Sequence, residues 1–381
     1  MARTRRRFLR ILGGTTILAA AGAGAWLGTR TPTEAILPWE MAGSGYTDPR
    51  MRMLSYAILA PNPHNRQPWL VDLAEPDTIT LYCDLERRLP ETDPFDRQIT
   101  IGLGCFLEGL ALAASAEGQV AEITAFPEGE PTPRLDARPV ATIRLSPGGA
   151  PDPLFAEIPR RHTNKEPFDV SQPVAPAELE ALVAAAGADV TTSGTLDRDR
   201  IVTLRDLAWR AHMVEVETPR TLMESVDLMR IGRSEIEANP DGIDLGGPML
   251  ETLSVFGVLT RDQIADPTSQ AFAQGLDMYR EIIGSAMGFL WLATPDGRQH
   301  EIAAGRAWMR QALTASAAGL GLHPLSQALQ EYPEMATLYE EIHQSLVPES
   351  GLRLQMFARL GYGPPVGPSP RWPVESRVRT A

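Results

Sequence analysis

Residues 160–168 read RRHTNKEPF, and this stretch says more about the fold than any other part of the chain. It places two guanidinium groups, a hydroxyl, an amide and an ammonium close together. Guanidinium groups offer planar, paired donors that match phosphate oxygens, and they stay protonated in proteins. The stretch therefore indicates an anion-binding site. A solvated basic loop that pairs with an acidic surface would have the same composition.

A second polar stretch lies upstream, at residues 60–69, and reads APNPHNRQPW. The amides of Asn65 and Gln67 both donate and accept hydrogen bonds, which suits a ligand edge that alternates donors and acceptors. The prolines beside them stiffen the loop and lower the cost of ordering it. The simpler alternative is a capped turn that joins a helix to a strand.

Two C-terminal segments complete the pattern: residues 319–327 read GLGLHPLSQ, and residues 361–374 read GYGPPVGPSPRWPV. Together with the first two stretches, in this order, they make the chain resemble the nitroreductase-like FMN proteins. The resemblance is greatest to the Acg-type subfamily, in which two nitroreductase-type halves are fused in one chain. It covers most of residues 50–375. It implies an α+β fold in which helices wrap antiparallel-dominated sheets, with FMN held where the two halves meet.

The resemblance also implies roles for particular side chains. Arg161 and Thr163 match the family's Arg-x-Ser/Thr run, and either Asn164 or Lys165 meets the flavin N1/O2 edge, where a fixed donor raises the reduction potential. The turn near 325–327 offers backbone N–H groups to flavin N5 and O4. The expected cofactor-binding residues are Asn62, His64, Asn65, Gln67, Arg160, Arg161, Thr163, Asn164, Lys165, Leu325, Ser326, Gln327 and Arg371.

The function implied is an FMN-dependent oxidoreductase that reduces a small electrophile, such as a nitro or quinone-like compound. No catalytic side chain is expected, because the flavin carries the chemistry. One FMN per chain is expected, since no Arg-x-Ser/Thr run precedes Asn62. A Met- and Leu-rich insertion at 219–268, interpreted as a lid, leaves open an FMN-binding or storage protein with little turnover. A scaffold without cofactor is a third alternative.

The N-terminus resembles a twin-arginine export signal. Residues 4–10 read TRRRFLR, and a weakly apolar Gly/Ala-rich segment follows from 11 to about 28. This segment is less hydrophobic than a typical membrane span, although it is just long enough to serve as an anchor. We expect folded export by the twin-arginine machinery, to the periplasm or to a membrane-anchored position facing it. NADH and NADPH are scarce there, which favours a quinone or a membrane partner over NAD(P)H as electron donor. The expected acceptor is a small molecule.

Composition excludes several other classes. The net charge of −13 argues against a nucleic-acid-binding protein, which needs a basic face. The two cysteines, Cys83 and Cys105, lack the spacing of a redox or metal motif and are expected to be buried as small apolar residues. No metal site is expected, because His323 has no second ligand at a supporting spacing. The glycine motifs of dinucleotide-binding and P-loop folds are absent from the sequence.

Turn residues indicate a linker at 31–48 after the signal or anchor at 1–30, and an internal boundary at 146–153. The resemblance implies that the parts on either side of this boundary, 49–150 and 151–381, are the two nitroreductase-like halves. The order helix, hairpin, helix and two strands occurs in outline twice, but the sequence has no strong residue-level repeat. Helices are expected at 49–59, 97–117, 176–187, 197–217, 270–293, 300–320 and 333–345. Strands are expected at 69–74, 78–84, 119–125, 139–145, 188–192 and 353–361.

Overall fold

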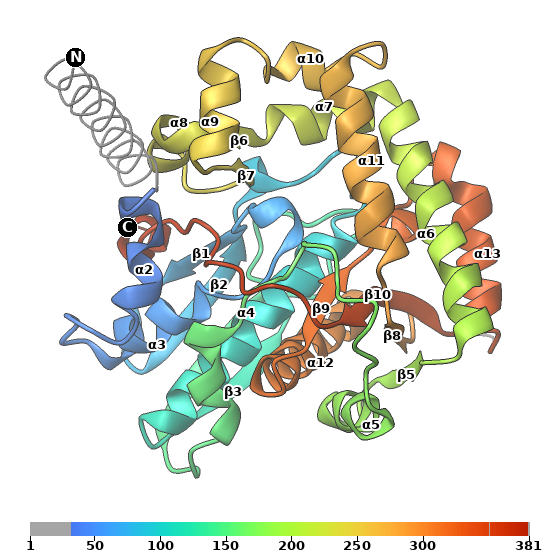
Figure 1. Ribbon diagram of the computed structural model, residues 1–381. Coiled ribbons are helices and arrows are strands. Elements are labelled where there is room, and N and C mark those ends of the chain that lie inside the picture. The colour runs from blue at the N-terminus through green and yellow to red at the C-terminus, as the bar shows by residue number, and fades with distance from the viewer. Residues whose placement is uncertain (1–31, 350, 380–381) are drawn as a thin grey trace, which may run out of the picture.

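Two four-stranded antiparallel sheets organise the protein (Figure 1). The structure is a computed structural model that describes residues 32–349 and 351–379, so the expected export signal at 1–30 lies outside the described residues. In spatial order, the first sheet contains β1 (Trp69–Asp72), β2 (Thr78–Cys83), β4 (Ala141–Pro147) and β3 (Gln119–Ala125). The second contains β5 (Thr191–Thr195), β8 (Gly288–Thr294), β10 (Arg353–Gly361) and β9 (Gly321–Pro324).

The two sheets have the same topology. Each is built from two strands, a helix of 20 residues and two more strands, and in each the last strand lies between the second and the third. The long helices are α4 (Arg97–Ala116) and α12 (Arg298–Ala317). All neighbouring strands in both sheets are antiparallel. The α+β class with antiparallel-dominated sheets is therefore confirmed.

The helices α4 and α12 cross at a pair of glycines. Gly104 and Gly305 are each the eighth residue of their helix. A Cβ atom on Gly104 would clash with the carbonyl oxygen of Ile302, and a Cβ on Gly305 would clash with that of Ile101. The thiol of Cys105 donates to the Gly305 carbonyl at 3.1 Å. Only glycine permits this approach, so the crossing fixes how the two sheets are placed relative to each other.

An arginine at the first position of each long helix ties it to the opposite sheet. Arg97 is 1 % exposed and donates to the Leu329 carbonyl at 2.6 Å, in the loop between β9 and β10. Arg298 is 6 % exposed and donates to the Pro133 carbonyl at 2.8 Å, in the loop between β3 and β4. Each guanidinium thus donates hydrogen bonds to backbone carbonyls of the other unit. Each also forms an ion pair, Arg97 with Glu331 and Arg298 with Glu301.

One hydrophobic core is shared by both units. It contains Ile79 and Ile143 of the first sheet together with Leu290 and Ala358 of the second, and α4 runs through it. Within residues 32–349 and 351–379, α4 is the one helix long and apolar enough to cross a membrane, and it is mostly buried in this core. A second cluster covers the other face of the second sheet, where α6, α11 and α13 pack (Figure 1). Cys83 and Cys105 are buried and unpaired, as expected.

Most expected helices form close to their predicted bounds. They are α3 (Pro49–Ala57), α5 (Pro176–Ala185), α6 (Arg198–Glu217) and α13 (Ala336–Leu346), while α11 (Gln270–Gly284) starts where predicted but is shorter. The 219–268 insertion is mostly helical, with α7 (Pro219–Asp227), α8 (Gly232–Ala238), α9 (Pro248–Val255) and α10 (Arg261–Ala265). Short 3₁₀ turns are η1 (Glu34–Ile36), η2 (Pro63–Asn65), η3 (Leu85–Arg87), η4 (Pro153–Arg160), η5 (Gln327–Leu329), η6 (Pro333–Met335) and η7 (Val374–Arg377).

Two predictions are wrong in their details. The helix expected at 270–293 ends at Gly284, and its last part is the central strand β8. Nearly every residue of β8 is buried, so no alternation of apolar and polar residues betrayed a strand. The segment 31–48 is more than a linker, because η1 and α2 (Leu37–Glu40) form there and Trp39 is buried. The short strands β9, β6 (Met229–Ile231) and β7 (Ile243–Leu245) were not expected.

The C-terminal tail returns from the second sheet to the first unit (Figure 1). The backbone N–H of Arg371 donates to the Ala35 carbonyl at 2.8 Å, and that of Arg379 donates to the Val71 carbonyl at 2.8 Å. Val378 also forms an isolated parallel bridge with Val71 on β1. The two sheets are therefore separated in sequence near residue 150, but the C-terminal tail, which belongs to the second half, packs against the first.

Replacing the crossing glycine should destabilise the protein strongly. We expect Gly104→Ala to lower the free energy of unfolding by about 1–3 kcal/mol, because its methyl group meets a carbonyl of α12 that cannot move away. Gly275→Ala in α11 is the matched control, since a Cβ there has open space and should add up to about 1 kcal/mol of stability. Denaturant unfolding followed by circular dichroism measures both. Equal effects of the two substitutions would contradict the close crossing.

Candidate cofactor site

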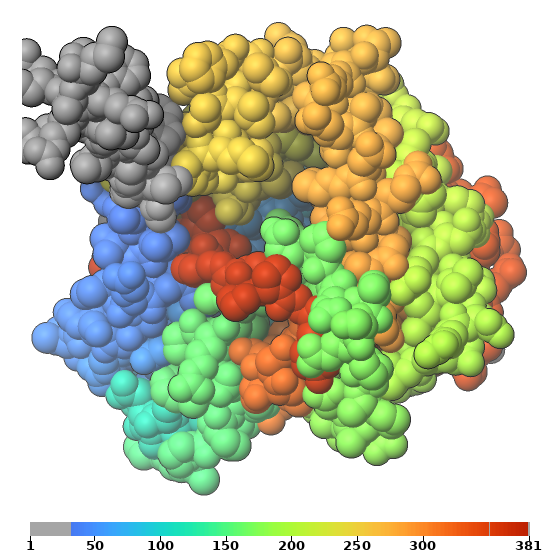
Figure 2. Space-filling view, in the orientation of Figure 1, coloured from blue at the N-terminus to red at the C-terminus, as the bar shows by residue number. Residues whose placement is uncertain are grey.

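A hollow lies near the middle of the face shown in Figure 2. It is bounded by the yellow insertion and the orange helix α11 on one side, and by the red tail and the green segment of the 160s on the other. Lys165 and Asp244 are accessible to solvent, and Lys165 influences the pKa of Asp244, His64 and His323. Burial by the surrounding protein raises the pKa of Asp244 although its side chain is accessible. This combination is that of a residue lining an interior space, which we call the cationic hollow.

Two buried arginines lie side by side at the hollow. Arg161 is 4 % exposed and Arg371 is 3 % exposed. Both donate to the Leu59 carbonyl at 3.3 Å, and Arg371 also donates to the carbonyls of Ile58 at 2.9 Å and Ala60 at 3.1 Å. These carbonyls follow the C-terminus of α3, the partially negative end of a helix. The buried ring of Trp39 lies 5.9 Å from the Arg161 guanidinium and 5.2 Å from that of Arg371.

The charge of this pair is only partly compensated. Among the described residues, neither guanidinium lies within ion-pair distance of a carboxylate, and the Nε atom of Arg161 is buried without a partner. Burial lowers the pKa of Arg161 to about 10. Burial, and then the neighbouring Arg161, lower the pKa of Arg371 to about 9, against the opposing influence of Asp244. All five N–H groups of Arg371 donate within the protein, so Arg371 adds positive charge while Arg161 keeps a donor. The site therefore fits a bound anion, such as a phosphate group, held through Arg161.

The loop at 62–67 belongs to the first unit and reaches the tail and insertion of the second. His64, Asn65 and Gln67 all have positive φ angles, of 46°, 50° and 51°. Such a run of left-handed, non-glycine residues persists only where surrounding contacts hold it. The side-chain oxygen of Asn62 accepts the Gln67 backbone N–H at 2.7 Å, and the backbone N–H of Gly242 donates to the Asn65 carbonyl at 3.2 Å.

The amides of this loop are engaged within the protein. Gln67 is fully buried, donates to the Pro240 carbonyl at 2.7 Å and accepts the Trp372 backbone N–H at 2.9 Å. Asn65 donates to the Pro370 carbonyl at 3.0 Å and accepts from Arg371 at 2.6 Å. The structure thus brings the loop to the site as expected, but these two side chains hold the tail and Arg371 in place.

His64 lies under the insertion. Its Nε2 is 3.4 Å from the Ser225 hydroxyl, and its Nδ1 is buried without a partner. Burial, and then the nearby charges of Lys165 and Arg66, lower the pKa of His64 to about 4. The imidazole is therefore neutral at physiological pH, and its unpartnered nitrogen is free for a hydrogen bond to a ligand.

Asn164 and Lys165 have different roles. The amide of Asn164 donates to the Pro364 carbonyl at 2.8 Å and accepts the Glu166 backbone N–H at 3.0 Å. Its hydrogen-bonding capacity is spent on joining the 160s to the tail. Lys165 is accessible in the cationic hollow, so it is the one of the two with a side chain available to a ligand. Thr163 accepts from Arg161 at 3.3 Å and lies beside the arginine pair.

The turn at 325–327, which was expected to offer N–H groups to flavin N5 and O4, joins β9 to η5. The Leu325 N–H is bonded to the Phe357 carbonyl at 2.8 Å, and its side chain is buried. No hydrogen bond is described for the N–H groups of Ser326 and Gln327, which leaves them available to a ligand. Three residues after this turn, the amide of Gln330 donates to the buried Glu215 carboxyl of α6 at 2.5 Å.

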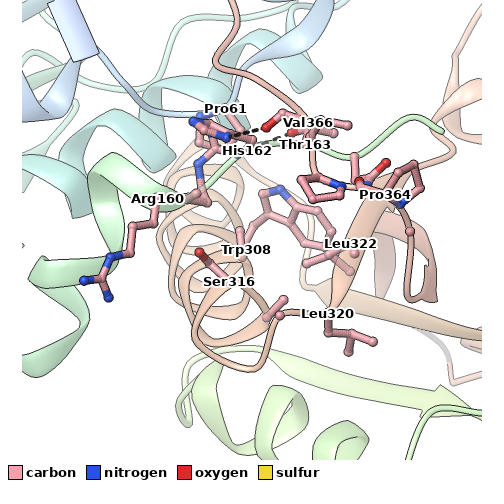
Figure 3. A pocket seen from close by; sticks show the side chains of 18 residues that line it. Pro61, Arg160, His162, Thr163, Trp308, Ser316, Leu320, Leu322, Pro364 and Val366 are labelled. Carbon is pink, nitrogen blue, oxygen red and sulfur yellow. Dashed lines mark hydrogen bonds between the residues drawn. The ribbon is translucent and has the colours of Figure 1, made fainter. Parts of the chain in front are cut away.

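Arg160 is not part of the arginine pair. Its side chain is 71 % exposed and pairs with Glu157 at 3.1 Å. In Figure 3 it extends away from Trp308 and Leu322, which line a cavity of about 320 Å³. Arg160, Arg161, Thr163 and Asn164 form part of the wall of the same cavity. This cavity is on the α12 side of the 161–164 segment, and His162 closes one edge of it through a 3.0 Å contact with the Val366 carbonyl.

Two important residues were missed from the sequence. Trp39, in the supposed linker, packs beside the arginine pair, and its indole N–H donates to the Ser369 carbonyl at 2.8 Å. Arg359 is fully buried in β10, donates to the Glu166 carbonyl at 2.8 Å and to His323 Nδ1 at 2.9 Å, and so positions the segment before Phe168. The signal for Arg359 was present, because an arginine inside an apolar strand needs buried partners.

Comparison with known proteins gives a consistent class. No protein-family model matches the chain. A Mycobacterium tuberculosis protein named "Putative NAD(P)H nitroreductase Rv3131" is 26 % identical over 347 residues, which cover 85 % of this chain and 91 % of that protein. The M. tuberculosis protein named "Putative NAD(P)H nitroreductase acg" is 34 % identical over 101 residues, which cover 26 % of this chain and 29 % of that protein. The chain is thus nitroreductase-like in sequence.

Similarity to solved structures is weaker. The FMN-dependent nitroreductase NfnB from Mycobacterium smegmatis, solved with NADPH, is 16 % identical with a TM-score of 0.34, over 53 % of this chain and 84 % of that one. A nitroreductase-like family protein from Bacillus cereus is 14 % identical with a TM-score of 0.34, over 60 % of this chain and 96 % of that one.

The support beneath the 325–327 turn should respond to pH. Burial raises the pKa of Glu215 to about 7 from 4.5, so the native state keeps a proton that the unfolded chain loses. This contribution to stability is complete below pH 4.5 and is lost as the pH rises through about 7. Glu215→Gln carries no such proton. The stability of the variant relative to the native chain should therefore rise by about 3 kcal/mol between pH 4.5 and pH 8.

Glu217→Gln, on the exposed side of the same helix, is the control for this measurement. Urea unfolding at both pH values gives the comparison. A Glu215→Gln difference that stays constant with pH would mean that this carboxyl is ionised in the native protein.

Proposed function

We propose that this protein is an FMN-dependent oxidoreductase of the nitroreductase-like class that reduces a small electrophile, such as a nitro or quinone-like compound. The observation that carries the proposal is the pair Arg161 and Arg371, two buried guanidinium groups without a carboxylate partner. A protein keeps such a pair where a bound anion completes it. The similarity to proteins named as NAD(P)H nitroreductases supports FMN as that ligand.

The residues at the hollow fit FMN group by group. Arg161 and Thr163 would hold the phosphate while Arg371 adds positive charge beside them, Lys165 would face the N1/O2 edge, and the N–H groups of Ser326 and Gln327 would face the N5/O4 edge. When bound, FMN supplies the two-electron transfer chemistry. The side chains of this chain then bind and orient the flavin, raise its potential with a fixed cation and limit access to it.

We further propose that the two units correspond to the two subunits of a nitroreductase dimer, fused in one chain with one FMN. The shared topology of the sheets and the helix crossing support this. The loop at 62–67 acts in the role of a partner's loop, since it meets Arg371 and the insertion of the second unit. The first unit has no arginine pair equivalent to Arg161 and Arg371 in the family pattern, which supports a single site.

Two electron donors are compatible with the proposed function. The similarity to proteins named as NAD(P)H nitroreductases favours NAD(P)H. We propose export through the twin-arginine pathway on the basis of residues 4–10, and export makes a quinone or a membrane partner the competing donor. An anaerobic absorbance experiment separates these: bleaching of the flavin by NADPH favours the first, and bleaching only by a quinol favours the second.

A second candidate function is FMN storage with little turnover, and one observation favours it. The insertion is fastened to the loop at 62–67, because Pro240 accepts from Gln67 and Gly242 donates to Asn65. Asp241 adds ion pairs to Arg87 at 2.5 Å and Arg66 at 3.8 Å. Asp241→Asn should loosen this fastening. A gain in steady-state turnover would support a lid that blocks substrate, whereas unchanged turnover would support an open site.

Arg161→Ala should weaken FMN binding by about 2–4 kcal/mol, the scale of losing charge-assisted bonds to phosphate in a buried site. The matched control is Arg160→Ala, which removes an exposed arginine and should change the affinity by less than about 0.5 kcal/mol. Titration calorimetry with FMN measures both. The proposed phosphate site is wrong if both variants bind FMN with native affinity.

Lys165→Met should lower the reduction potential of the bound flavin, because it removes the fixed cation beside the ring. For a two-electron couple, the shift is on the order of 30 mV for each 1.4 kcal/mol of lost stabilisation. Lys165→Arg keeps the charge and should retain most of the native potential. Anaerobic redox titration gives the values, and an unchanged potential in Lys165→Met would move the assignment away from Lys165.

A further inference from the structure

The helix α9 and the turn after it carry an exposed apolar surface on the insertion. Four large side chains within residues 249–258 are mostly exposed: Met249 at 71 %, Val255 at 66 %, Phe256 at 78 % and Val258 at 54 %. Met249 and Phe256 are seven residues apart, so they lie on the same side of a helix. We call these four residues the α9 surface. Contiguous apolar exposure of this kind marks a contact surface in soluble proteins.

The helix α9 combines exposed apolar side chains with a buried acidic one. Its single charged residue, Glu251, is 8 % exposed and accepts the Arg233 backbone N–H at 3.4 Å. Met249 and Val255 are exposed near its two ends, and Phe256 and Val258 follow it and are exposed as well. An ordinary surface helix exposes its charges and buries its apolar side. A segment that exposes Phe, Met and Val while burying its Glu is suited to an apolar medium outside the protein.

The place where the described chain begins indicates what that medium is. The N–H groups of Thr33, Glu34 and Ala35 all donate to the Glu237 carboxylate, at 2.7, 3.1 and 2.8 Å. Glu237 is on α8, the helix that precedes α9 and packs against it. The segment before residue 32 contains the apolar stretch 11–28, which is just long enough to enter a bilayer. Residues 33–35, which follow this stretch in the sequence, are thus held on α8, next to α9.

We propose that the α9 surface docks on a lipid bilayer, with Phe256 and its apolar neighbours inserted among the acyl chains at the interface. Docking there would bring the insertion that borders the cationic hollow to the membrane. The proposal does not depend on the identity of the cofactor, because it rests on the exposed side chains and the point of chain entry.

A fluorophore at the α9 surface tests the contact directly. The full-length chain carrying Phe256→Cys is labelled with an environment-sensitive dye and mixed with vesicles of phosphatidylethanolamine and phosphatidylglycerol. Val202→Cys is the matched control, because Val202 is 63 % exposed and belongs to α6, which lies on the opposite side of α11 from α9 (Figure 1). The native thiols of Cys83 and Cys105 do not interfere, since both are buried and burial raises the pKa of each.

The expected result is a blue shift of the dye at position 256, with loss of its emission when the vesicles contain a spin-labelled lipid, and neither change at position 202. Three outcomes would overturn the proposal. Vesicle flotation without quenching at position 256 would mean that residues 1–31 alone bind the membrane. Quenching at both positions would mean non-specific adsorption. A blue shift without vesicles, accompanied by dimer mass in light scattering, would identify a second copy of the chain as the occupant.

Discussion

The whole arrangement depends on the contact between two helix backbones at Gly104 and Gly305. Because neither residue has a side chain, α4 and α12 approach until each meets the carbonyl of the other. That approach sets the distance between the two sheets, and the arginines at the two helix starts then reach loops of the opposite unit. The shared core follows from the same contact, since apolar residues of both sheets pack around the crossing. The site inherits its geometry from this frame, because it is assembled from both units.

The charges of the two buried arginines at the site are only partly compensated by the groups around them. Arg161 and Arg371 are stabilised by carbonyls at the end of α3 and by the ring of Trp39, but no carboxylate neutralises them. Partial dipoles offset part of the cost of a buried charge and leave the remainder available to a ligand. Polar side chains around the pair have structural duties: Asn65 holds Arg371, and Asn164 joins the 160s to the tail. A rigid surround of this kind keeps the donors in place before a ligand arrives.

Much of the architecture was accessible from the sequence, and the failures have physical causes. Helices such as α4 and α6 have bounds fixed by local signals, an apolar period and a terminal turn, which a single sequence contains. The strand β8 is buried on both faces and therefore carries no period of two. In the site, residue types predicted the anion-binding stretch, but not which side chains remain available. Gln67 was a sound candidate by chemistry, and its engagement by Pro240 and Trp372 depends on partners far away in the chain.

The return of the C-terminal tail determines when the site can assemble during synthesis of the chain. Arg371 lies near the end of the chain, yet its partners Ile58 and Asn65 are among the first folded residues to be synthesised. On a ribosome, the arginine pair cannot assemble until Arg371 has left the exit tunnel. An anionic cofactor therefore finds both arginines in place only after the second sheet has been synthesised. Any premature stop that removes the tail leaves the two sheets intact in sequence but deprives the site of one of its two buried cations.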